Sequence, residues 1–198
     1  NVPQRYALAV EATPPPRAAL LPHIWLSDEE IRQGQRLLEQ LPDKAGTPPI
    51  ALHPYATHPD KAWKEAYWRQ LMELFESRGI PWIVIGRGNG MEGIPASRNF
   101  TNRTSLRETC ALLKSSSLLI TGDSGPMHLA GAVGTPVLAL FGPTTEEWGF
   151  FPAGPKDRVL ESQLDCRPCT LHGKKHCDRN HACMQSITPE QVMRALDE

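Results

Sequence analysis

The segment TGDSGPMH, at residues 121–128, carries the residue types that could hold a phosphorylated ligand. It follows an apolar run and predicts a strand-to-helix turn, whose free N–H groups and positive dipole end favour an anion. Ser124 can cap this helix or donate to a phosphate oxygen. His128 is expected on the same helical face, kept neutral because the helix N-terminus lowers its pKa. Alternatively, Asp123 and Ser124 only cap the helix and His128 is a buried core histidine; the segment alone does not decide.

Three other loops carry groups that could contact such a ligand. Lys61 ends a polar loop and could neutralise a phosphate, although most lysines are simply solvated. Glu92, in a glycine-rich loop, could accept hydrogen bonds from two ribose hydroxyls or could be merely exposed. The turn FGPTT at residues 141–145 brings two hydroxyls, one of them that of Thr144, to the same rim.

Two segments of the sequence match the residue pattern of a known motif, but the predicted structure around each segment differs from what the motif requires. GDSG at residues 122–125 is the nucleophile segment of chymotrypsin-like proteases, but those are all-β proteins whose histidine precedes the serine. GNGMEG at residues 88–93 has the spacing G-x-G-x-x-G, but Ile94-Pro95 follows where a dinucleotide-binding fingerprint needs a helix. The P-loop pattern G-x-x-x-x-G-K-[ST] does not occur. The sequence therefore does not indicate a serine protease, a Rossmann dinucleotide-binding fingerprint or a P-loop nucleotide site.

Four of the five cysteines lie in one short segment of the chain. They are Cys166, Cys169, Cys177 and Cys183. One C-x-x-C pair with two further thiols has the ligand count of a structural zinc site, although the second pair is spaced more loosely than in a zinc ribbon. Two disulfides or unligated thiols are the alternatives. We expect a metal here to be structural only.

Apolar runs alternate with amphipathic segments along the chain. Buried strands are predicted at residues 50–53, 82–85, 118–120 and 137–141. Helices are predicted at residues 27–41, 65–78, 105–113, 125–133 and 189–197. In the third helix Leu106, Cys110 and Leu113 are expected to point inward. The alternation predicts an α/β protein, a Rossmann-like parallel sheet with helices on both faces, plus a small Cys-rich appendage at residues 166–183. Ligands of such sheets bind beyond the carboxyl ends of the strands, where all of these loops begin.

Length and charge suit one domain with a short extension. Of the 198 residues, 21 are Lys or Arg and 22 are Asp or Glu, so the net charge of −1 gives no indication of a nucleic-acid partner or an anionic membrane surface. Residues 27–198 are expected to form the domain, and residues 1–26 an irregular linker between domains. We expect no transmembrane segment and no signal peptide.

Taken together, these motifs resemble glycosyltransferase family 9, the lipopolysaccharide heptosyltransferases. The resemblance rests on Lys61-x-Trp63, Glu92, DSGPMHLA at residues 123–130, FGPT at residues 141–144 and the tail Cys166-x-Pro168-Cys169…Cys177…Cys183-Met184. The motifs keep the family's order over about residues 50–195. The resemblance implies the C-terminal, donor-binding half of a GT-B enzyme, in which two Rossmann-like domains face each other across a cleft.

The resemblance also assigns roles to individual residues. The donor-binding set would be Lys61, Glu92, Asp123, Ser124, Gly125, His128 and Thr144. Lys61 would contact the donor phosphates and Glu92 the ribose, while Asp123 would bind sugar hydroxyls. Ser124 and Gly125 would hold the diphosphate. Lys61 and Asp123 would act in catalysis, through charge stabilisation and through positioning of the sugar.

The family's donor is typically ADP-L-glycero-D-manno-heptose, transferred with inversion and without a metal to the lipopolysaccharide inner core. The family's general base belongs to an N-terminal domain, so the resemblance implies that this chain lacks the base, is inactive alone and meets its acceptor through that domain. Some members carry an arginine before the lysine, where this chain has Thr57-His58-Pro59-Asp60. The expected location is cytoplasmic, at the inner membrane's cytoplasmic face, with peripheral association through the full-length enzyme.

Two other functions remain open from the sequence. One is a non-catalytic module that binds a nucleotide or a nucleotide-sugar. The other is a GT-B-like sugar-nucleotide epimerase, which needs carboxylates at the cleft; Glu146 and Glu147 are the nearby adjacent pair.

Overall fold

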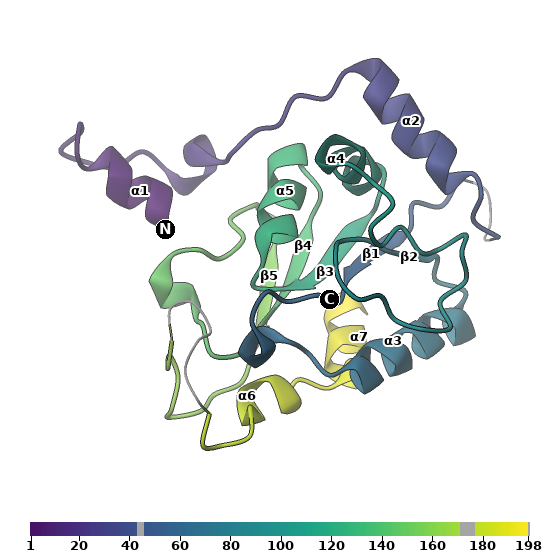
Figure 1. Ribbon diagram of the computed structural model, residues 1–198. Coiled ribbons are helices and arrows are strands. Elements are labelled where there is room, and N and C mark those ends of the chain that lie inside the picture. The colour runs from purple at the N-terminus through teal and green to yellow at the C-terminus, as the bar shows by residue number, and fades with distance from the viewer. Residues whose placement is uncertain (43–45, 171–176, 198) are drawn as a thin grey trace.

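A five-stranded, fully parallel sheet forms the centre of the protein (Figure 1). The computed structural model describes residues 1–42, 46–170 and 177–197. The strands are β1 (Ile50–His53), β2 (Trp82–Val84), β3 (Leu118–Gly122), β4 (Val137–Phe141) and β5 (Arg158–Glu161). They lie side by side in the order β2-β1-β3-β4-β5. The predicted parallel α/β architecture is therefore confirmed.

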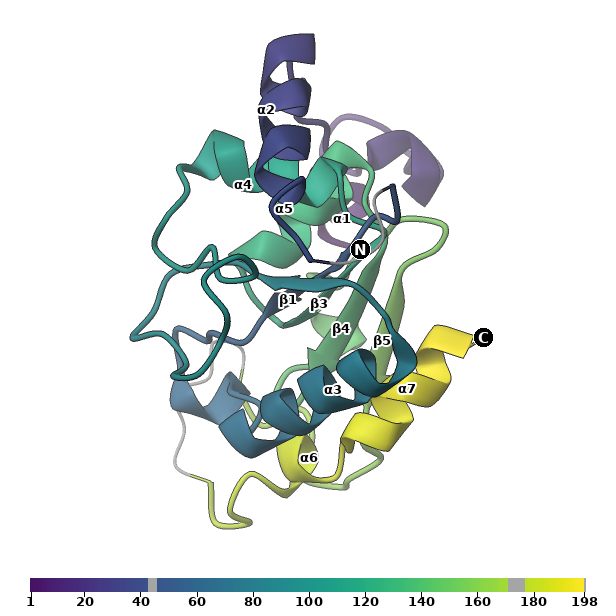
Figure 2. The ribbon, with the colours of Figure 1, turned by 90° about the vertical axis from the view of Figure 1, so that its right-hand side faces the viewer.

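Helices cover both faces of the sheet, as expected (Figure 2). The helices are α1 (Val2–Ala7), α2 (Asp28–Leu38), α3 (Glu65–Arg78), α4 (Leu106–Lys114), α5 (Gly125–Val133), α6 (Ala182–Gln185) and α7 (Pro189–Asp197). Short 3₁₀ turns are η1 (Arg17–Leu20), η2 (Pro59–Lys61) and η3 (Glu146–Trp148). Helices α3, α6 and α7 contribute to the core on one face, and α4 and α5 to the core on the other. Helix α2 packs against α4 as an outer layer.

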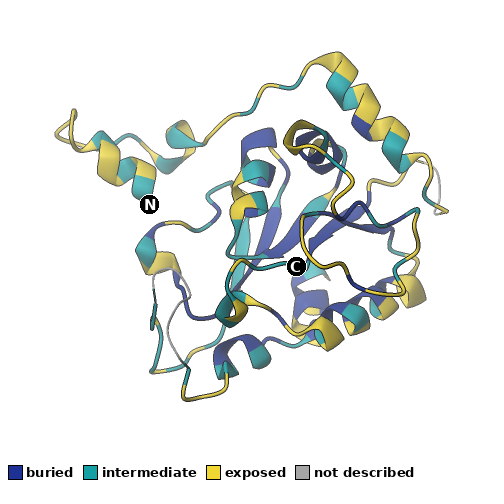
Figure 3. Cartoon of the chain, in the orientation of Figure 1, coloured by how far each residue is buried: buried dark blue, intermediate teal, exposed yellow. Residues whose placement is uncertain are grey.

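Buried residues concentrate on the sheet and on the helices beside it (Figure 3). Most of them are apolar. On one face Trp68 and Phe75 of α3 pack with Val192 of α7. On the other, Leu112 of α4 packs with Met127 of α5. Burying this apolar surface drives the assembly of the layers. Among the residues that the structure describes, no helix has the length and apolarity needed to cross a bilayer.

The signals that start and stop the helices are mostly confirmed. Ser27 and Ser105 each form the predicted capping box at the start of α2 and α4. Gly79 ends α3 with a φ of 64°, in the left-handed region that glycine adopts without a Cβ clash. Helix α5 spans the predicted residues, and α7 begins after Thr188 as expected.

Three expectations differ from the structure. Leu106 does not point into the core: it is 65% exposed, because burial in α4 starts only at Thr109, one turn further on. The stretch at residues 1–26 is not irregular throughout, since Asn1 and Gln4 form a capping box that starts α1. Strand β5 was not expected; it is an edge strand whose residues are all only half-buried, so it lacks the apolar run of the inner strands.

The expected Cys-rich appendage is not confirmed as a separate unit. Cys183 and Met184 of α6 are buried in the same core cluster as residues of α3 and α7. Helix α6 also contacts β4 directly. The end of the cysteine segment is therefore part of the packing against the sheet.

The contact between α2 and α4 predicts opposite effects for two helical glycines. A Cβ at Gly34 would lie 2.7 Å from the backbone carbon and oxygen of Ala111, whereas a Cβ at Gly131 would meet nothing within 4 Å. Gly34→Ala should lower the free energy of unfolding by about 1–3 kcal/mol through overpacking. Gly131→Ala, the matched control, should raise it by roughly 0.5–1 kcal/mol through helix propensity. Urea unfolding of both variants measures this, and a stabilised Gly34→Ala would contradict the close packing of α2 on α4.

Candidate functional site

The strand order places one crevice at the centre of the sheet. From β1 the chain crosses to β2 on one side and then returns to β3 on the other, so the topological switch point lies between β1 and β3. In open parallel sheets, ligands bind at this point beyond the carboxyl ends of the strands. His53 ends β1, and the loops that follow β1 and β3 carry Lys61, Asp123 and Ser124. The structure therefore brings the main predicted segments to one edge.

Lys61 and Asp123 form an ion pair at this edge. The Lys61 Nζ donates to the Asp123 Oδ2 at 2.6 Å, although the two residues are 62 positions apart. Their side chains are only 14% and 15% exposed, so the attraction is screened less by water than in a surface pair. Lys61 reaches Asp123 because η2 folds over the end of β3: a Cβ at Gly122 would lie 3.3 Å from the Lys61 carbonyl oxygen.

A second group of polar side chains lies beneath the turn at Ser124. The Thr121 hydroxyl is 3.0 Å from both the His53 Nδ1 and the Ser124 hydroxyl, and Ser124 Oγ is 3.3 Å from the same ring nitrogen. His53 and Thr121 are buried partners in the β1–β3 pairing. From the sequence alone neither residue has an assigned role, because His53 continues the apolar run of β1 and Thr121 only begins the segment at residues 121–128.

Ser124 does not cap α5 with its side chain. It occupies the N-cap position with extended backbone angles, φ −157° and ψ 168°, and its hydroxyl also contacts the Gly122 carbonyl oxygen at 3.2 Å. The first turn of α5 therefore has no side-chain cap, and Gly125 at its start is exposed. Free N–H groups and the helix dipole make such a terminus favourable for an anion.

A cavity of about 450 Å³ adjoins this turn. Its lining comes from the loops after β1 and β2 and from the first turns of α4 and α5: His53, Tyr55, Ala56, Thr57, Gly86, Arg87, Thr104, Leu106, Thr109, Ser124, Gly125, Pro126 and Leu129. The Tyr55 hydroxyl is fixed 2.7 Å from the Thr101 hydroxyl. A Cβ at Gly86 or Gly88 would overlap the Tyr55 ring, so these glycines allow the ring to pack on the loop. The cavity thus combines apolar walls with a few hydroxyls, as small-molecule sites do.

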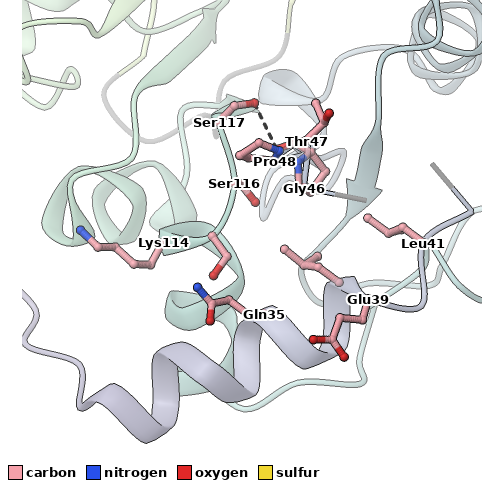
Figure 4. A pocket seen from close by; sticks show the side chains of 12 residues that line it. Gln35, Glu39, Leu41, Gly46, Thr47, Pro48, Lys114, Ser116 and Ser117 are labelled. Carbon is pink, nitrogen blue, oxygen red and sulfur yellow. Dashed lines mark hydrogen bonds between the residues drawn. The ribbon is translucent and has the colours of Figure 1, made fainter. Parts of the chain in front are cut away.

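Another cavity, of about 550 Å³, lies at the opposite edge of the sheet (Figure 4). Gln35 of α2 and Glu39, directly after this helix, line one side of it, and Ser116 and Ser117 line another. Ser117 directly precedes β3, so this cavity adjoins the amino ends of the strands. Ligand sites in open parallel sheets do not form at that edge. We therefore place the candidate site at the smaller cavity, beside Ser124.

His128 and Ser124 border different cavities. His128 faces a cavity of about 230 Å³ that also contacts Leu21 and Phe151. The expected shared helical face fails because Ser124 is extended rather than helical, so the spacing of four residues does not apply. Partial desolvation lowers the pKa of His128, while the negative charge of Asp123 opposes the shift. The shift has the expected direction, and desolvation is its main cause.

The remaining predicted residues lie outside the cavity beside Ser124. Glu92 is exposed, and its carbonyl oxygen accepts from Arg69 at 2.9 Å. Thr144 is buried at the carboxyl end of β4, and its Oγ1 has no hydrogen-bond partner within the part of the chain that the structure describes. The roles of both in donor binding stay predictions. Glu146 and Glu147, the carboxylates an epimerase would need, are exposed in η3.

No disulfide joins the four clustered cysteines, all of which lie among the described residues. Across residues 1–42, 46–170 and 177–197, no three His, Cys, Asp or Glu side chains converge on a point that could hold a metal ion. The thiols as placed do not form a zinc site. Two of the histidines among them, His172 and His176, lie outside the described residues. Structural zinc stays a prediction, which metal analysis of the purified protein tests. Cys110 is buried in the core, as expected.

Burial of His53 predicts a pH-dependent stability. Because its ring is desolvated, its pKa falls from 6.5 to about 4. Above pH 6.5 the residue is neutral in both states; as the pH falls from 6.5 to 4 the unfolded chain takes up the proton first, which costs about 3 kcal/mol of stability. Denaturant unfolding from pH 7 to pH 4 should show a shallower loss for His53→Gln, which does not titrate, than for the wild type. Parallel pH profiles would contradict a buried, neutral His53.

Comparison with known proteins gives a family match over most of the chain. Residues 2–178 match glycosyltransferase family 9 (heptosyltransferase). A lipooligosaccharide heptosyltransferase 2 of Campylobacter jejuni is 33% identical over 67% of this chain and 44% of its own length. A lipopolysaccharide heptosyltransferase 1 of Pseudomonas aeruginosa is 35% identical over 70% of this chain and 40% of its own length.

The fold recurs in a solved structure, that of Escherichia coli ADP-heptose lps heptosyltransferase II. It superposes with a TM-score of 0.69 at 23% identity and covers 90% of this chain and 53% of the other. The chain spans about half the length of the curated relatives it matches. Since the family match extends over most of the described residues, from α1 to beyond β5, this chain belongs to glycosyltransferase family 9, the heptosyltransferases.

Proposed function

We propose that this chain is the donor-binding part of an inverting glycosyltransferase, which transfers heptose from an ADP-linked donor to the inner core of lipopolysaccharide. One observation carries the proposal: Lys61 and the uncapped start of α5 lie together at the switch point of the sheet. The similarity to proteins named heptosyltransferases supports the sugar, and the E. coli protein named for ADP-heptose supports the nucleotide.

The nucleoside of the donor would occupy the cavity of about 450 Å³. Tyr55, Leu106 and Leu129 supply apolar surface for a base, and Thr104 and Thr109 place hydroxyls on the same wall. The exposure of Leu106 fits this role, because a leucine at a ligand cavity need not reach the core. Glu92 would contact the ribose only if its loop moved toward the cavity, since its side chain is exposed to solvent.

The diphosphate would lie at the start of α5. Ser124 and Gly125 line the cavity, and the helix dipole adds positive potential there. Lys61 is the nearby cation, and its ion pair with Asp123 holds it at this edge. In transfer, negative charge develops on the departing ADP, and a fixed lysine with a helix N-terminus stabilises that charge without reorganising.

Asp123 would turn to the sugar once Lys61 contacts phosphate. A carboxylate accepts hydrogen bonds from two sugar hydroxyls, and this one lies next to the proposed diphosphate position. The general base must reach the acceptor hydroxyl, so we assign it to the part of the relatives' length that this chain does not span. That part would also bind the acceptor and bring the enzyme to the cytoplasmic face of the inner membrane.

Calorimetric titration with ADP tests the role of Lys61. Lys61→Ala removes the cation and leaves the Asp123 carboxylate unpaired beside the phosphates, so ADP affinity should fall by about 10- to 100-fold, as for other hydrogen bonds to charged groups. Lys64→Ala is the matched control, because Lys64 is exposed and contacts Gln185. Equal affinities of the two variants would contradict the proposed phosphate site. UDP and GDP in the same titration identify the nucleotide, and we expect ADP to bind best.

The variant Asp123→Asn distinguishes the contribution of the sugar to donor binding from that of the nucleotide. The neutral amide would no longer hold Lys61 by charge, so ADP should bind as tightly as to the wild type or more tightly. The gain in affinity from ADP to ADP-heptose should disappear, since the carboxylate that accepts from the sugar is gone. Competition binding with both ligands measures the ratio of the ADP-heptose affinity to the ADP affinity. A variant that loses ADP affinity but keeps the ratio would place Asp123 at the nucleotide instead.

A further inference from the structure

Arg167, in the cysteine segment, is a buried cation that no role above uses. Its side chain is 5% exposed, and all three guanidinium nitrogens donate hydrogen bonds. Nη2 donates to the Thr144 carbonyl at 2.8 Å, to the Phe141 carbonyl at 3.3 Å and to the Glu161 carboxylate at 2.8 Å. Nε donates to the Gly142 carbonyl. A single side chain thus holds three carbonyls of one turn, residues 141–145.

These bonds fix a backbone that would otherwise be costly to bury. Phe141, Gly142 and Thr144 are all buried, and a buried carbonyl without a partner costs about 1–3 kcal/mol. The planar guanidinium reaches several carbonyls at once, which a lysine ammonium cannot do from one position. The remaining nitrogen, Nη1, donates to the Ser162 carbonyl beyond β5. Arg167 therefore ties the turn after β4 to the end of β5.

Two further contacts hold the same turn from the cysteine segment. The Cys169 N–H donates to the Pro143 carbonyl at 3.2 Å. A Cβ at Gly142 would overlap the Met184 thioether, so α6 lies directly against the turn. With Arg167, these contacts join the cysteine segment to residues 141–144 at four backbone positions.

The turn lies on the sugar side of the proposed donor site. Strand β4 pairs with β3, with Leu140 opposite Gly122, so the turn leaves the sheet beside Asp123. The nucleoside cavity lies on the other side, toward β1 and β2. Arg167 holds the Thr144 carbonyl, while the buried Thr144 hydroxyl has no hydrogen-bond partner among the described residues.

We propose that Arg167 is a positioning residue for the donor's sugar: it fixes the 141–145 turn next to Asp123 and so sets the shape of the sugar side of the site. This inference rests on the function proposed above. It gives the cysteine segment a part in sugar recognition that requires no metal.

Binding of ADP and of ADP-heptose to variants of this chain tests the proposal. Arg167→Gln should weaken ADP-heptose binding by about 10- to 100-fold, the size expected when a supporting residue lets a site shift by about 1 Å. ADP binding should stay within about twofold, because the nucleotide cavity lies across Asp123 from the turn. Arg167→Lys keeps the positive charge but not the planar guanidinium that reaches several carbonyls. It should therefore recover only part of the ADP-heptose affinity that Arg167→Gln loses. Arg179→Gln is the matched control: this arginine of the same segment is exposed and paired with Asp165, and it should change neither affinity.

Equal loss of both affinities in Arg167→Gln would show a general structural role and overturn the proposal, as would no loss of either. If Arg167→Gln does not fold, Glu161→Gln replaces it, since it removes the charged partner of Nη2 and leaves the carbonyls in place. It should lower the ADP-heptose affinity selectively by about 3- to 10-fold; unchanged or equally reduced affinities overturn the proposal. A wild type that binds neither ligand refutes the proposed function itself, whereas a wild type that binds both, with Arg167→Gln unchanged, refutes only the role of Arg167.

Discussion

The parallel pairing of β1 with β3 is the constraint on which the rest of the site depends. Its register puts His53 opposite Thr121, so the two loops that leave these strands start side by side. One loop returns as η2 and lays the Lys61 carbonyl over Gly122; the other turns into α5. Residues 62 positions apart thereby reach hydrogen-bond distance, and the start of a helix is left uncapped beside them.

The charges at this edge balance each other. A lysine and an aspartate that are each about 15% exposed would both lose hydration without a partner, and their mutual ion pair offsets that cost. His53 is kept neutral by burial, so it supports the turn through hydrogen bonds without adding charge. An arriving diphosphate would take the place of the Asp123 carboxylate as the partner of the Lys61 ammonium.

The sequence predicted the parts of this protein that follow from local patterns. Apolar runs located four of the five strands, and capping boxes located the starts of α2 and α4. Lys61 and Asp123 could be found because polar loops follow apolar strands. His53 could not, since it continues the run of β1 and its partners lie on another strand. Arg167 could not be predicted either, because the spacing of the cysteines around it indicated metal binding. Its carbonyl partners are also distant in sequence.

A crystal structure of this chain with ADP tests the central claim most directly. The account predicts the diphosphate at the start of α5, within hydrogen-bond distance of the Gly125 N–H and the Lys61 Nζ, and the adenosine against Tyr55 in the cavity beside Ser124. Density for ADP at the opposite edge of the sheet, in the cavity lined by Gln35 and Ser117, or phosphates away from Lys61, would contradict it.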